Sequence, residues 1–224
     1  MIYGVWLGDK HCYDDYGMLL AQKNIGFPDV QTNMIEVLGR NGLLDLTESM
    51  SGGPKYYNRE IGLTFITSDK LSGMAWSELI SAVACGIHGQ QIKIVFDEDE
   101  DYYYLGRCRI NQFTTSRAKR TIEIICDCDP FKYKTEETTT TVSLTANVEQ
   151  TITLTNEYMT ATPTIVVDGG EDVNVTIVCG TSSAVFGSGS YLSSALALPE
   201  GETEWTVSAD EACTVTISYQ EGTL

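Results

Sequence analysis

The acidic run from Asp97 to Asp101 is the first stretch whose residue types could bind a metal ion. Its alternating carboxylates are typical of the beginning of a calcium loop, in which oxygen ligands surround the ion. Such a loop needs a glycine where this chain has Tyr102 and a bidentate glutamate where it has Cys108. We therefore interpret the run as the solvated tip of a hairpin. No metal and no other cofactor is expected.

Seven cysteines are a second possible source of chemistry, as metal ligands or as disulfides. Their number is odd and their spacing is scattered, which is typical of reduced thiols in a cytoplasm rather than of a disulfide framework. Cys126 and Cys128 are two residues apart, so they lie on one face of a strand. No second Cys or His pair with zinc spacing follows them, which favours buried thiols that fill a core.

Nucleophilic catalysis has few candidate residues in this chain. His11 and His88 are the only histidines, neither lies in a motif that presents a nucleophile, and no Gly-x-Ser-x-Gly motif occurs. Carboxylate pairs for glycoside cleavage arise by chance in any chain this acidic. We therefore expect no enzyme and no catalytic residue. A pocket that collects several carboxylates with raised pKa values would be the contrary observation.

The segment 36–49 contains two closely spaced glycines, Gly39 and Gly42, which raises the question of a phosphate-binding loop. A phosphate loop needs a lysine followed by Ser or Thr after the glycines, and it lies between a parallel strand and a helix. Neither feature is found in the sequence. We expect a structural loop in which both glycines allow positive φ and Arg40 reaches outward.

Charge divides the chain into two parts. The formal net charge is -17, and all 14 Lys and Arg residues lie at or before Lys134. Residues 1–134 contain 14 basic and 18 acidic residues, whereas residues 135–224 contain 13 acidic residues and no Lys or Arg. This step predicts two domains, 1–134 and 135–224. The acidic excess argues against stable nucleic-acid binding, which needs clustered Lys and Arg.

The N-terminal residues lack the basic and apolar regions of a signal peptide. No apolar run approaches the roughly 20 residues that are needed to span a bilayer. We therefore expect a soluble chain that does not insert into a membrane.

The first part of the chain is expected to be mostly β, with one amphipathic helix at residues 72–86. Apolar residues recur there at helical spacing, with Ser72 as the expected cap and Gly86 as the expected stop. Residues 91–96 and 102–110 alternate on either side of the acidic run, which predicts a hairpin. Further strands are expected at residues 57–67 and 120–128.

The second part contains eight short β-rich runs between residues 140 and 222, separated by Gly, Asp, Asn and Pro. Their spacing is typical of a β-sandwich, so we expect two antiparallel sheets of roughly four strands each. The Thr-rich stretch before them is either a linker or the first strand. The whole chain is therefore predicted to be mainly β, with a helix only in its first domain.

Several motifs follow one another along the chain: YGVWLGDKHCYDDYGMLLAQ, IEVLGRNGLLDLTES, YYNREIGLTFI, YYYLGRCRI and DPFKY. In this order they resemble the N-terminal domain of the distal tail proteins of long-tailed siphophages and related prophages. A Pro-Gly-Arg loop and a Pro-Phe-x-Tyr ending are typical of that family, and Leu38 stands here in place of the loop proline. The second part is similar to the galectin-like or carbohydrate-binding-like sandwich that follows in many members. The resemblance therefore covers the whole chain.

The resemblance implies a structural virion protein that forms a hexameric ring at the distal tip of the phage tail, assembled in the bacterial host cytoplasm. In the family the N-terminal domains close the ring and the C-terminal domains project outward. A tail-tube protein lies above the ring, and the tail-associated hub protein of the receptor-binding apparatus lies below it. Such a ring uses a head-to-tail interface. The candidate interface residues are Gly39, Arg40, Asn41 and Gly42.

The alternative function is a carbohydrate-binding adhesion module of the tail that recognises a host-surface glycan. Sandwiches of this kind bind sugars through an aromatic platform with nearby polar groups. Tyr191, Trp205 and Tyr219 are the candidate glycan contacts. Trp205 lies in an expected strand, where an aromatic residue more often belongs to the core.

Charge also bears on the passage of the genome through such a ring. Six copies with a net charge of -17 each would form an acidic assembly to which a polyanion does not adhere. We therefore expect no affinity for duplex DNA. Retardation of DNA would instead indicate a basic surface built from Arg107, Arg109, Arg117, Lys119 and Arg120.

Overall fold

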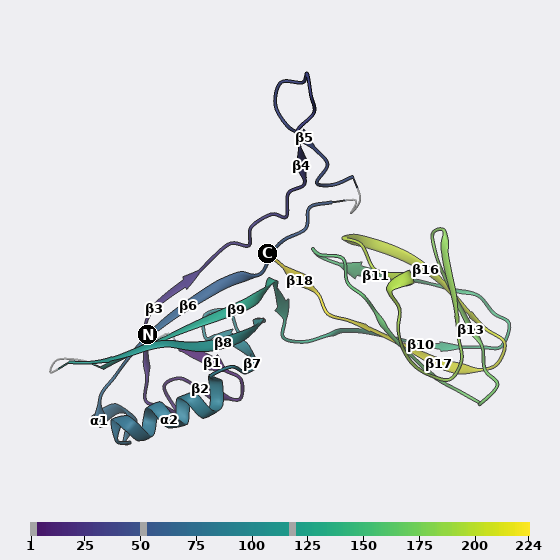
Figure 1. Ribbon diagram of the computed structural model, residues 1–224. Coiled ribbons are helices and arrows are strands. Elements are labelled where there is room, and N and C mark those ends of the chain that lie inside the picture. Colours follow the sequence, from purple (N-terminus) through teal and green to yellow (C-terminus); the bar gives the residue numbers. More distant parts are fainter. Residues whose placement is uncertain (1–3, 50–52, 117–119) are drawn as a thin grey trace. The chain divides into compact units, whose positions relative to one another are not determined.

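The computed structural model describes residues 4–49, 53–116 and 120–224 (Figure 1). The described chain is mainly β, as predicted. It divides into two compact units, one formed by residues 1–132 with Leu224 and the other by residues 133–223. Two residues of the basic surface considered above, Arg117 and Lys119, lie outside the described parts of the chain.

The first unit is built on one large antiparallel sheet with the strand order β2-β1-β7-β8-β9-β6-β3 (Figure 1). β8 and β9 are longer than the other strands of this sheet. The strands are β1 (Val5–Leu7), β2 (Lys10–His11), β3 (Leu19–Ile25), β6 (Arg59–Thr67), β7 (Gln91–Phe96), β8 (Tyr102–Thr115) and β9 (Arg120–Lys134).

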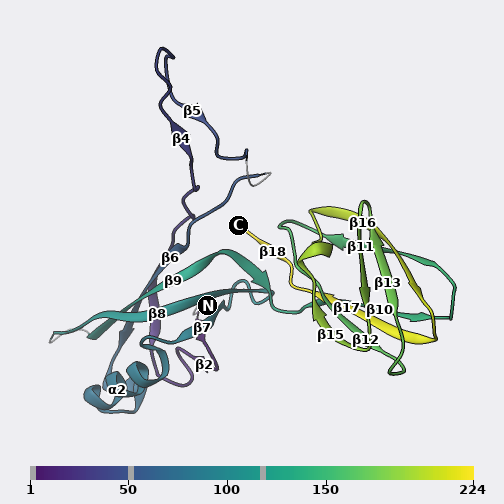
Figure 2. The same ribbon diagram turned by 45° about the vertical axis from the view of Figure 1, so that its right-hand side comes forward.

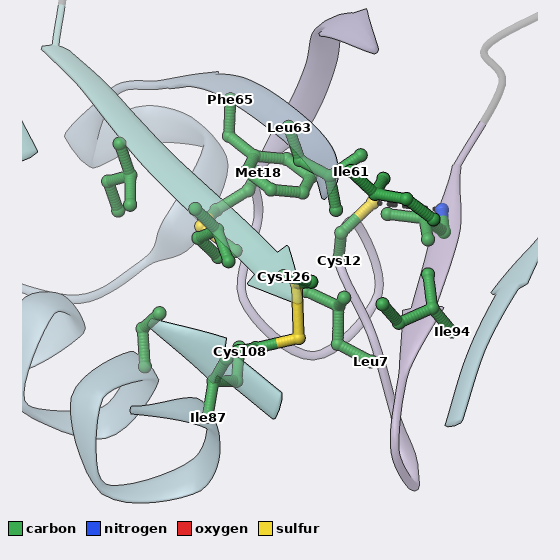
Figure 3. Packing of buried hydrophobic residues seen from close by; sticks show 14 of the residues in the cluster. Leu7, Cys12, Met18, Ile61, Leu63, Phe65, Ile87, Ile94, Cys108 and Cys126 are labelled. Carbon is green, nitrogen blue, oxygen red and sulfur yellow. Dashed lines mark hydrogen bonds between the residues drawn. A yellow bond between two sulfur atoms is a disulfide. The ribbon is translucent and has the colours of Figure 1, made fainter. Parts of the chain in front are cut away.

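One face of this sheet forms the core of the first unit. In β6 the alternation of apolar and polar residues buries Ile61, Leu63 and Phe65 on the same side. Their partners across the β6–β9 pair are Cys126, Ile124 and Ile122, which are buried as well. Figure 3 shows the side chains of Ile61, Leu63, Phe65 and Cys126 together with Leu7 of β1 and Ile87 of the helix. The period-two pattern in the sequence therefore identifies the buried face.

The helix that covers this core begins later than the sequence predicted. α2 spans Trp76–Ile87 and buries Leu79, Val83 and Ile87, whereas Ser72 ends a separate four-residue helix, α1 (Asp69–Ser72). Ser72 therefore does not cap α2. Gly86 lies inside α2 and does not end it. A Cβ atom at this position would lie only 2.8 Å from the Tyr16 hydroxyl, which explains why the residue is glycine.

The cysteines differ from the sequence prediction in one pair. Cys108 of β8 and Cys126 of β9 form a disulfide (Figure 3), so the expectation that all seven are reduced is wrong. The two strands are neighbours in the sheet, which brings together cysteines 18 residues apart in the chain. Cys128 is a buried free thiol, as predicted, and burial raises its pKa to about 12.

The acidic run forms the turn of the β7–β8 hairpin, as predicted, and Glu98, Glu100 and Asp101 are exposed. Three of its carboxylates nevertheless bind distant parts of the first unit. The contacts are Asp97 Oδ2 with the Gly4 amide (2.8 Å) and His11 Nε2 (3.3 Å), Glu98 with Lys23, and Asp99 Oδ2 with Lys132 Nζ (2.6 Å). These partners come from the N-terminus, β2, β3 and β9. The run therefore fastens several elements of the unit to one turn.

The second unit is a sandwich of two four-stranded antiparallel sheets, as predicted. The strand orders are β10-β17-β12-β15 and β11-β16-β13-β14. The Thr-rich stretch forms the first strand rather than a linker. The strands are β10 (Thr138–Leu144), β11 (Gln150–Asn156), β12 (Thr164–Asp168), β13 (Val175–Cys179), β14 (Ser182–Phe186), β15 (Gly189–Leu192), β16 (Gly201–Ala209) and β17 (Cys213–Tyr219), followed by β18 (Gly222–Thr223).

A buried carboxylate, Glu221, joins the beginning and the end of the sandwich. It accepts hydrogen bonds from the Thr138 hydroxyl at 2.5 Å and the Glu157 amide at 3.1 Å, and Lys134 Nζ lies 3.2 Å from it. Burial by itself raises the pKa of Glu221, but these hydrogen bonds and the lysine outweigh it and lower the pKa below its ordinary value. The ionised form therefore stabilises this closure.

Candidate functional site

A long arm leaves the first unit between β3 and β6 (Figures 1 and 2). The β3–β6 ladder ends at Ile25, where the Gly26 amide still donates to Glu60 O at 3.0 Å. Beyond this point the described residues of the arm form one isolated bridge and one short pair of strands, β4 (Met34–Ile35) and β5 (Leu44–Asp45). A few separate hydrogen bonds also join its two sides, among them the Gln31 amide to Lys55 O at 2.8 Å and the Leu46 amide to Asn33 O at 2.9 Å. The arm is therefore a ribbon with few internal hydrogen bonds.

The tip of the arm contains all four residues predicted as an interface. Gly39 and Gly42 have φ angles of +80° and +78°, as their expected role in the loop requires. The Arg40 amide donates to Val37 O at 3.1 Å, which closes a turn. Arg40 and Asn41 are exposed, and within the described chain the Arg40 guanidinium has no hydrogen-bonded or ionic partner.

The arm presents far more apolar surface than its tip alone suggests. Every residue from Asp29 to Leu43 is exposed, and no residue of the hydrophobic core lies between Met18 and Ile61 in the described chain. Phe27 is 85% exposed and Leu38 is fully exposed, while Met34 and Leu43 are about half exposed. Contiguous exposed apolar surface of this kind marks an interaction site.

These flanking apolar residues are the part of the site that sequence reasoning missed. The signal was present in the segment 34–46, which is rich in apolar residues but follows neither the helical nor the strand period. Lack of either period indicates an irregular segment, and the exposure of its apolar residues becomes evident only in the structure.

The aromatic platform proposed for a glycan does not form. Trp205 is completely buried between β11 and β13, and Tyr219 is 3% exposed and donates its hydroxyl to Thr155 O at 2.6 Å. Both residues point into the sandwich because they follow the inward positions of their strands. Tyr191, in the edge strand β15, is 37% exposed and packs against Phe186.

The sandwich has a shallow polar hollow of about 390 Å³, and Tyr191 is not one of the residues that line it. Asn174 donates its backbone and side-chain N–H groups to the two oxygens of Asp210 at 2.7 and 2.9 Å, and these bonds lower the pKa of Asp210. No aromatic or cationic side chain contributes to the hollow, which is lined by Asn147, Glu149, Asn174, Thr176, Ser208, Ala209 and Asp210. It therefore suits neutral hydroxyl-bearing groups better than anions.

Two further features bear on the class of protein. No helix in the described parts of the chain has the length and apolar character needed to cross a bilayer. The same parts contain no cluster of three or more His, Cys, Asp or Glu side chains that could hold a metal ion.

Comparison with known proteins gives a likeness in structure but not in sequence. No protein-family model matches the chain, and no curated protein sequence matches it. Among solved structures, the chain is similar to the SPP1 phage Dit (gp 19.1) protein, described as a paradigm of the hub adsorption apparatus in phages that infect Gram-positive bacteria. The TM-score is 0.69 at 18% sequence identity, and the match covers 100% of both chains. The chain therefore has the fold of this phage Dit protein along its whole length.

Proposed function

We propose that this chain is a distal tail protein, a structural component of the virion of a long-tailed bacteriophage or prophage. The full-length fold likeness to the SPP1 Dit protein is the observation that carries the proposal. The order of the sequence motifs supports it independently, because those motifs do not depend on the structure. The proposed place of the protein is the tip of the tail, after assembly in the bacterial host.

The proposed form is a hexameric ring that joins the tail tube to the hub and receptor-binding apparatus. The exposed arm supports this form, since exposed apolar residues such as Phe27 and Leu38 are typical of a surface that contacts another molecule. Head-to-tail contacts between copies close into a ring when the rotation per copy divides a full turn. The partners are other copies of the chain, a tail-tube protein and a hub protein. The proposed role requires no catalysis and no cofactor.

Native mass spectrometry of the full chain tests the ring directly. We expect a six-copy species, and negative-stain electron microscopy of the same sample should show closed rings. A chain that stays monomeric at high concentration would contradict the proposal. A filament would also contradict it, because the same head-to-tail contact would then fail to close.

A second candidate function is adhesion to a host-surface glycan through the sandwich. The polar hollow around Asn174 and Asp210 favours it, because amide, hydroxyl and carboxylate groups there face solvent without a competing cation. Glycan-array binding of the full chain, compared with Asn174→Ala, is the test. Binding that is unchanged in the variant, or absent from both proteins, would count against this function.

A further inference from the structure

The tip of the arm contains the single Asn-Gly pair of the sequence, Asn41 and Gly42. The pair lies in the loop 36–43 between β4 and β5, and both residues are exposed. In such a pair the backbone nitrogen of the glycine can attack the side-chain amide of the asparagine, because the glycine has no side chain that shields this nitrogen. The chemistry of the pair therefore allows a spontaneous modification.

Gly42 has the conformational freedom that this attack requires. Its φ angle is +78°, in the region that glycine adopts without steric cost. Apart from its own neighbours in the chain, no heavy atom lies within 4 Å of the position that a Cβ atom would occupy. Ring closure between the two residues therefore meets no packed element.

Hydrogen bonds do not hold the two reacting groups apart. Within residues 4–49, 53–116 and 120–224, neither the Asn41 side chain nor the Gly42 amide has a hydrogen-bonded partner. The loop is closed instead by the Arg40 amide, which donates to Val37 O at 3.1 Å. Local rearrangement costs least where few hydrogen bonds and packing contacts must be broken. The loop can therefore reach the geometry of attack while the rest of the unit stays folded.

Asn174 shows how the fold protects another exposed asparagine. Its side chain donates to Asp172 O at 3.0 Å and to Asp210 Oδ2 at 2.9 Å. The residue that follows it is the β-branched Val175, whose side chain shields the backbone nitrogen. Asn174 is thus matched to Asn41 in exposure but held by hydrogen bonds.

The Asp-Gly pair of the sandwich, Asp168 and Gly169, is also restrained. An Asp-Gly pair reacts by the same route with loss of water. Asp168, however, is paired with Thr214 in the β12–β17 ladder, and a Cβ atom at Gly169 would lie 2.9 Å from the Cys213 Cβ atom. Ladder pairing and close packing leave this glycine little freedom to turn. The structure therefore distinguishes the pair in the arm from the pair in the sandwich.

We propose that Asn41 deamidates spontaneously through a succinimide formed with Gly42, which makes the tip of the arm a modification site. The Gly42 nitrogen forms a bond to Asn41 Cγ, the bond from Cγ to Nδ2 breaks, and Nδ2 leaves as ammonia with the proton of the Gly42 amide. Water then opens the ring. Attack of water at Cγ gives aspartate, and attack at the backbone carbonyl gives isoaspartate, in which the chain continues through Cγ. The reaction depends on this loop and not on the proposed function.

Deamidation changes both the charge and the backbone of the loop. Residues 36–43 contain one acidic residue, Glu36, and one basic residue, Arg40, so their net charge is zero. Conversion of Asn41 adds a carboxylate directly beside Arg40, and an isoaspartate also inserts an additional atom into the backbone of the turn. Both changes alter the loop that contains the candidate interface residues.

Ageing of the full-length protein in a mildly alkaline buffer tests the site, because such a buffer favours loss of the amide proton. Fresh and aged samples are mapped by mass spectrometry with a protease that does not cut at Arg40. We expect the Asn41 peptide to lose its side-chain amide severalfold faster than the Asn174 peptide, and an isoaspartate methyltransferase to methylate it. Asn41→Gln is the matched variant, since glutamine must close a larger ring, and it should show neither change.

Two results of the peptide map would overturn the inference. An Asn41 amide that is lost no faster than the Asn174 amide would show that the open loop does not promote the reaction. A product that contains aspartate but no isoaspartate would exclude the succinimide, because ring opening gives both.

Native mass spectrometry of the same samples separates this inference from the proposed function. We expect ageing to lower the assembled fraction of the unmodified chain and to leave that of Asn41→Gln unchanged. An equal loss in both proteins would show that the modification does not affect assembly. A fresh chain that stays monomeric would contradict the ring, while the peptide map would still decide whether Asn41 deamidates.

Discussion

The two units differ in how completely they bury their own apolar surface. The sandwich places its largest aromatic residue, Trp205, at its centre, and its exposed apolar residues are scattered singly over the sheets. The first unit has a well-packed core too, but it also sends out an arm whose residues 29–43 are all exposed. The sandwich therefore buries its large aromatic core, whereas the first unit leaves the apolar residues of its arm exposed.

Charge follows the same division. All 14 Lys and Arg residues lie at or before Lys134, so the first unit carries charges of both signs and the sandwich carries almost only carboxylates. Mixed charges allow complementary contacts between copies, whereas a surface of one sign repels its own kind. The difference supports the proposal that copies of the chain contact one another through the first unit.

The largest effect is expected from removing the centre of the sandwich. Trp205→Ala should lower the free energy of unfolding of the sandwich by about 3–5 kcal/mol, because it leaves a cavity in a packed core. Thermal unfolding followed by circular dichroism measures the loss. Leu38→Ala, on the exposed arm, should change unfolding by less than about 0.5 kcal/mol. Equal effects of the two substitutions would contradict the contrast between the units.

Loss of the disulfide should affect the first unit alone. The disulfide between Cys108 and Cys126 joins residues 18 positions apart. Loss of a cross-link over a loop of that size lowers the free energy of unfolding by about 3 kcal/mol. Cys108→Ser should therefore lower the unfolding temperature of the first unit and leave that of the sandwich unchanged. Peptide mapping without reductant should recover the bridge from the unmodified chain. Recovery of free thiols at both positions would contradict it.

Arg40 should matter for assembly rather than for folding. If its exposed guanidinium makes a charge-assisted contact with a neighbouring copy or the hub protein, Arg40→Ala should weaken association by about 1.5–3 kcal/mol. Arg40→Lys keeps the charge but loses the planar donor geometry, so it separates the two contributions. Sedimentation equilibrium measures the association. Identical association of all three proteins would show that this arginine is merely solvated.

Acid should loosen the closure of the sandwich. The pKa of Glu221 is lower in the folded chain than its ordinary value of 4.5, so its stabilising effect is present above that pH and is lost as the pH falls through the folded-state pKa. Unfolding of the sandwich between pH 7 and pH 3 should therefore be less pH-dependent in Glu221→Gln than in the unmodified chain. Glu171→Gln, at an exposed loop position, is the control. A pH dependence that is the same in all three proteins would exclude this role.

The smallest expected effect concerns DNA. Arg107 and Arg109 are exposed on β8, but the acidic excess of the whole chain should prevent binding of duplex DNA. A gel-shift assay at about 10 mM salt, where the Debye length is about 30 Å, gives attraction its best chance. Retardation of DNA that disappears in an Arg107→Ala, Arg109→Ala variant would show that the first unit presents a basic surface.

The sequence by itself determined the features that depend on local pattern. Residues 57–67 predicted the strand that forms β6, and the short β-rich runs after residue 140 predicted the two-sheet sandwich. The alternation in residues 120–128 placed Cys126 and Cys128 in the core. The two glycines at 39 and 42 predicted a loop with positive φ at the place where the arm turns. Each of these features depends on residues only a few positions apart.

Tertiary structure alone decided the features that join distant residues. The carboxylates of the acidic run contact Lys23, Lys132 and His11, and Cys108 forms a disulfide with Cys126. These residues meet because the antiparallel sheet brings together strands that are far apart in the sequence. Trp205 is buried because its side of the sheet faces the second sheet of the sandwich. Leu38 is exposed because no other described element covers the tip of the arm. Local pattern reports which residues share a face of one element. Which other element covers that face depends on contacts between residues far apart in the chain, and a single sequence does not record them.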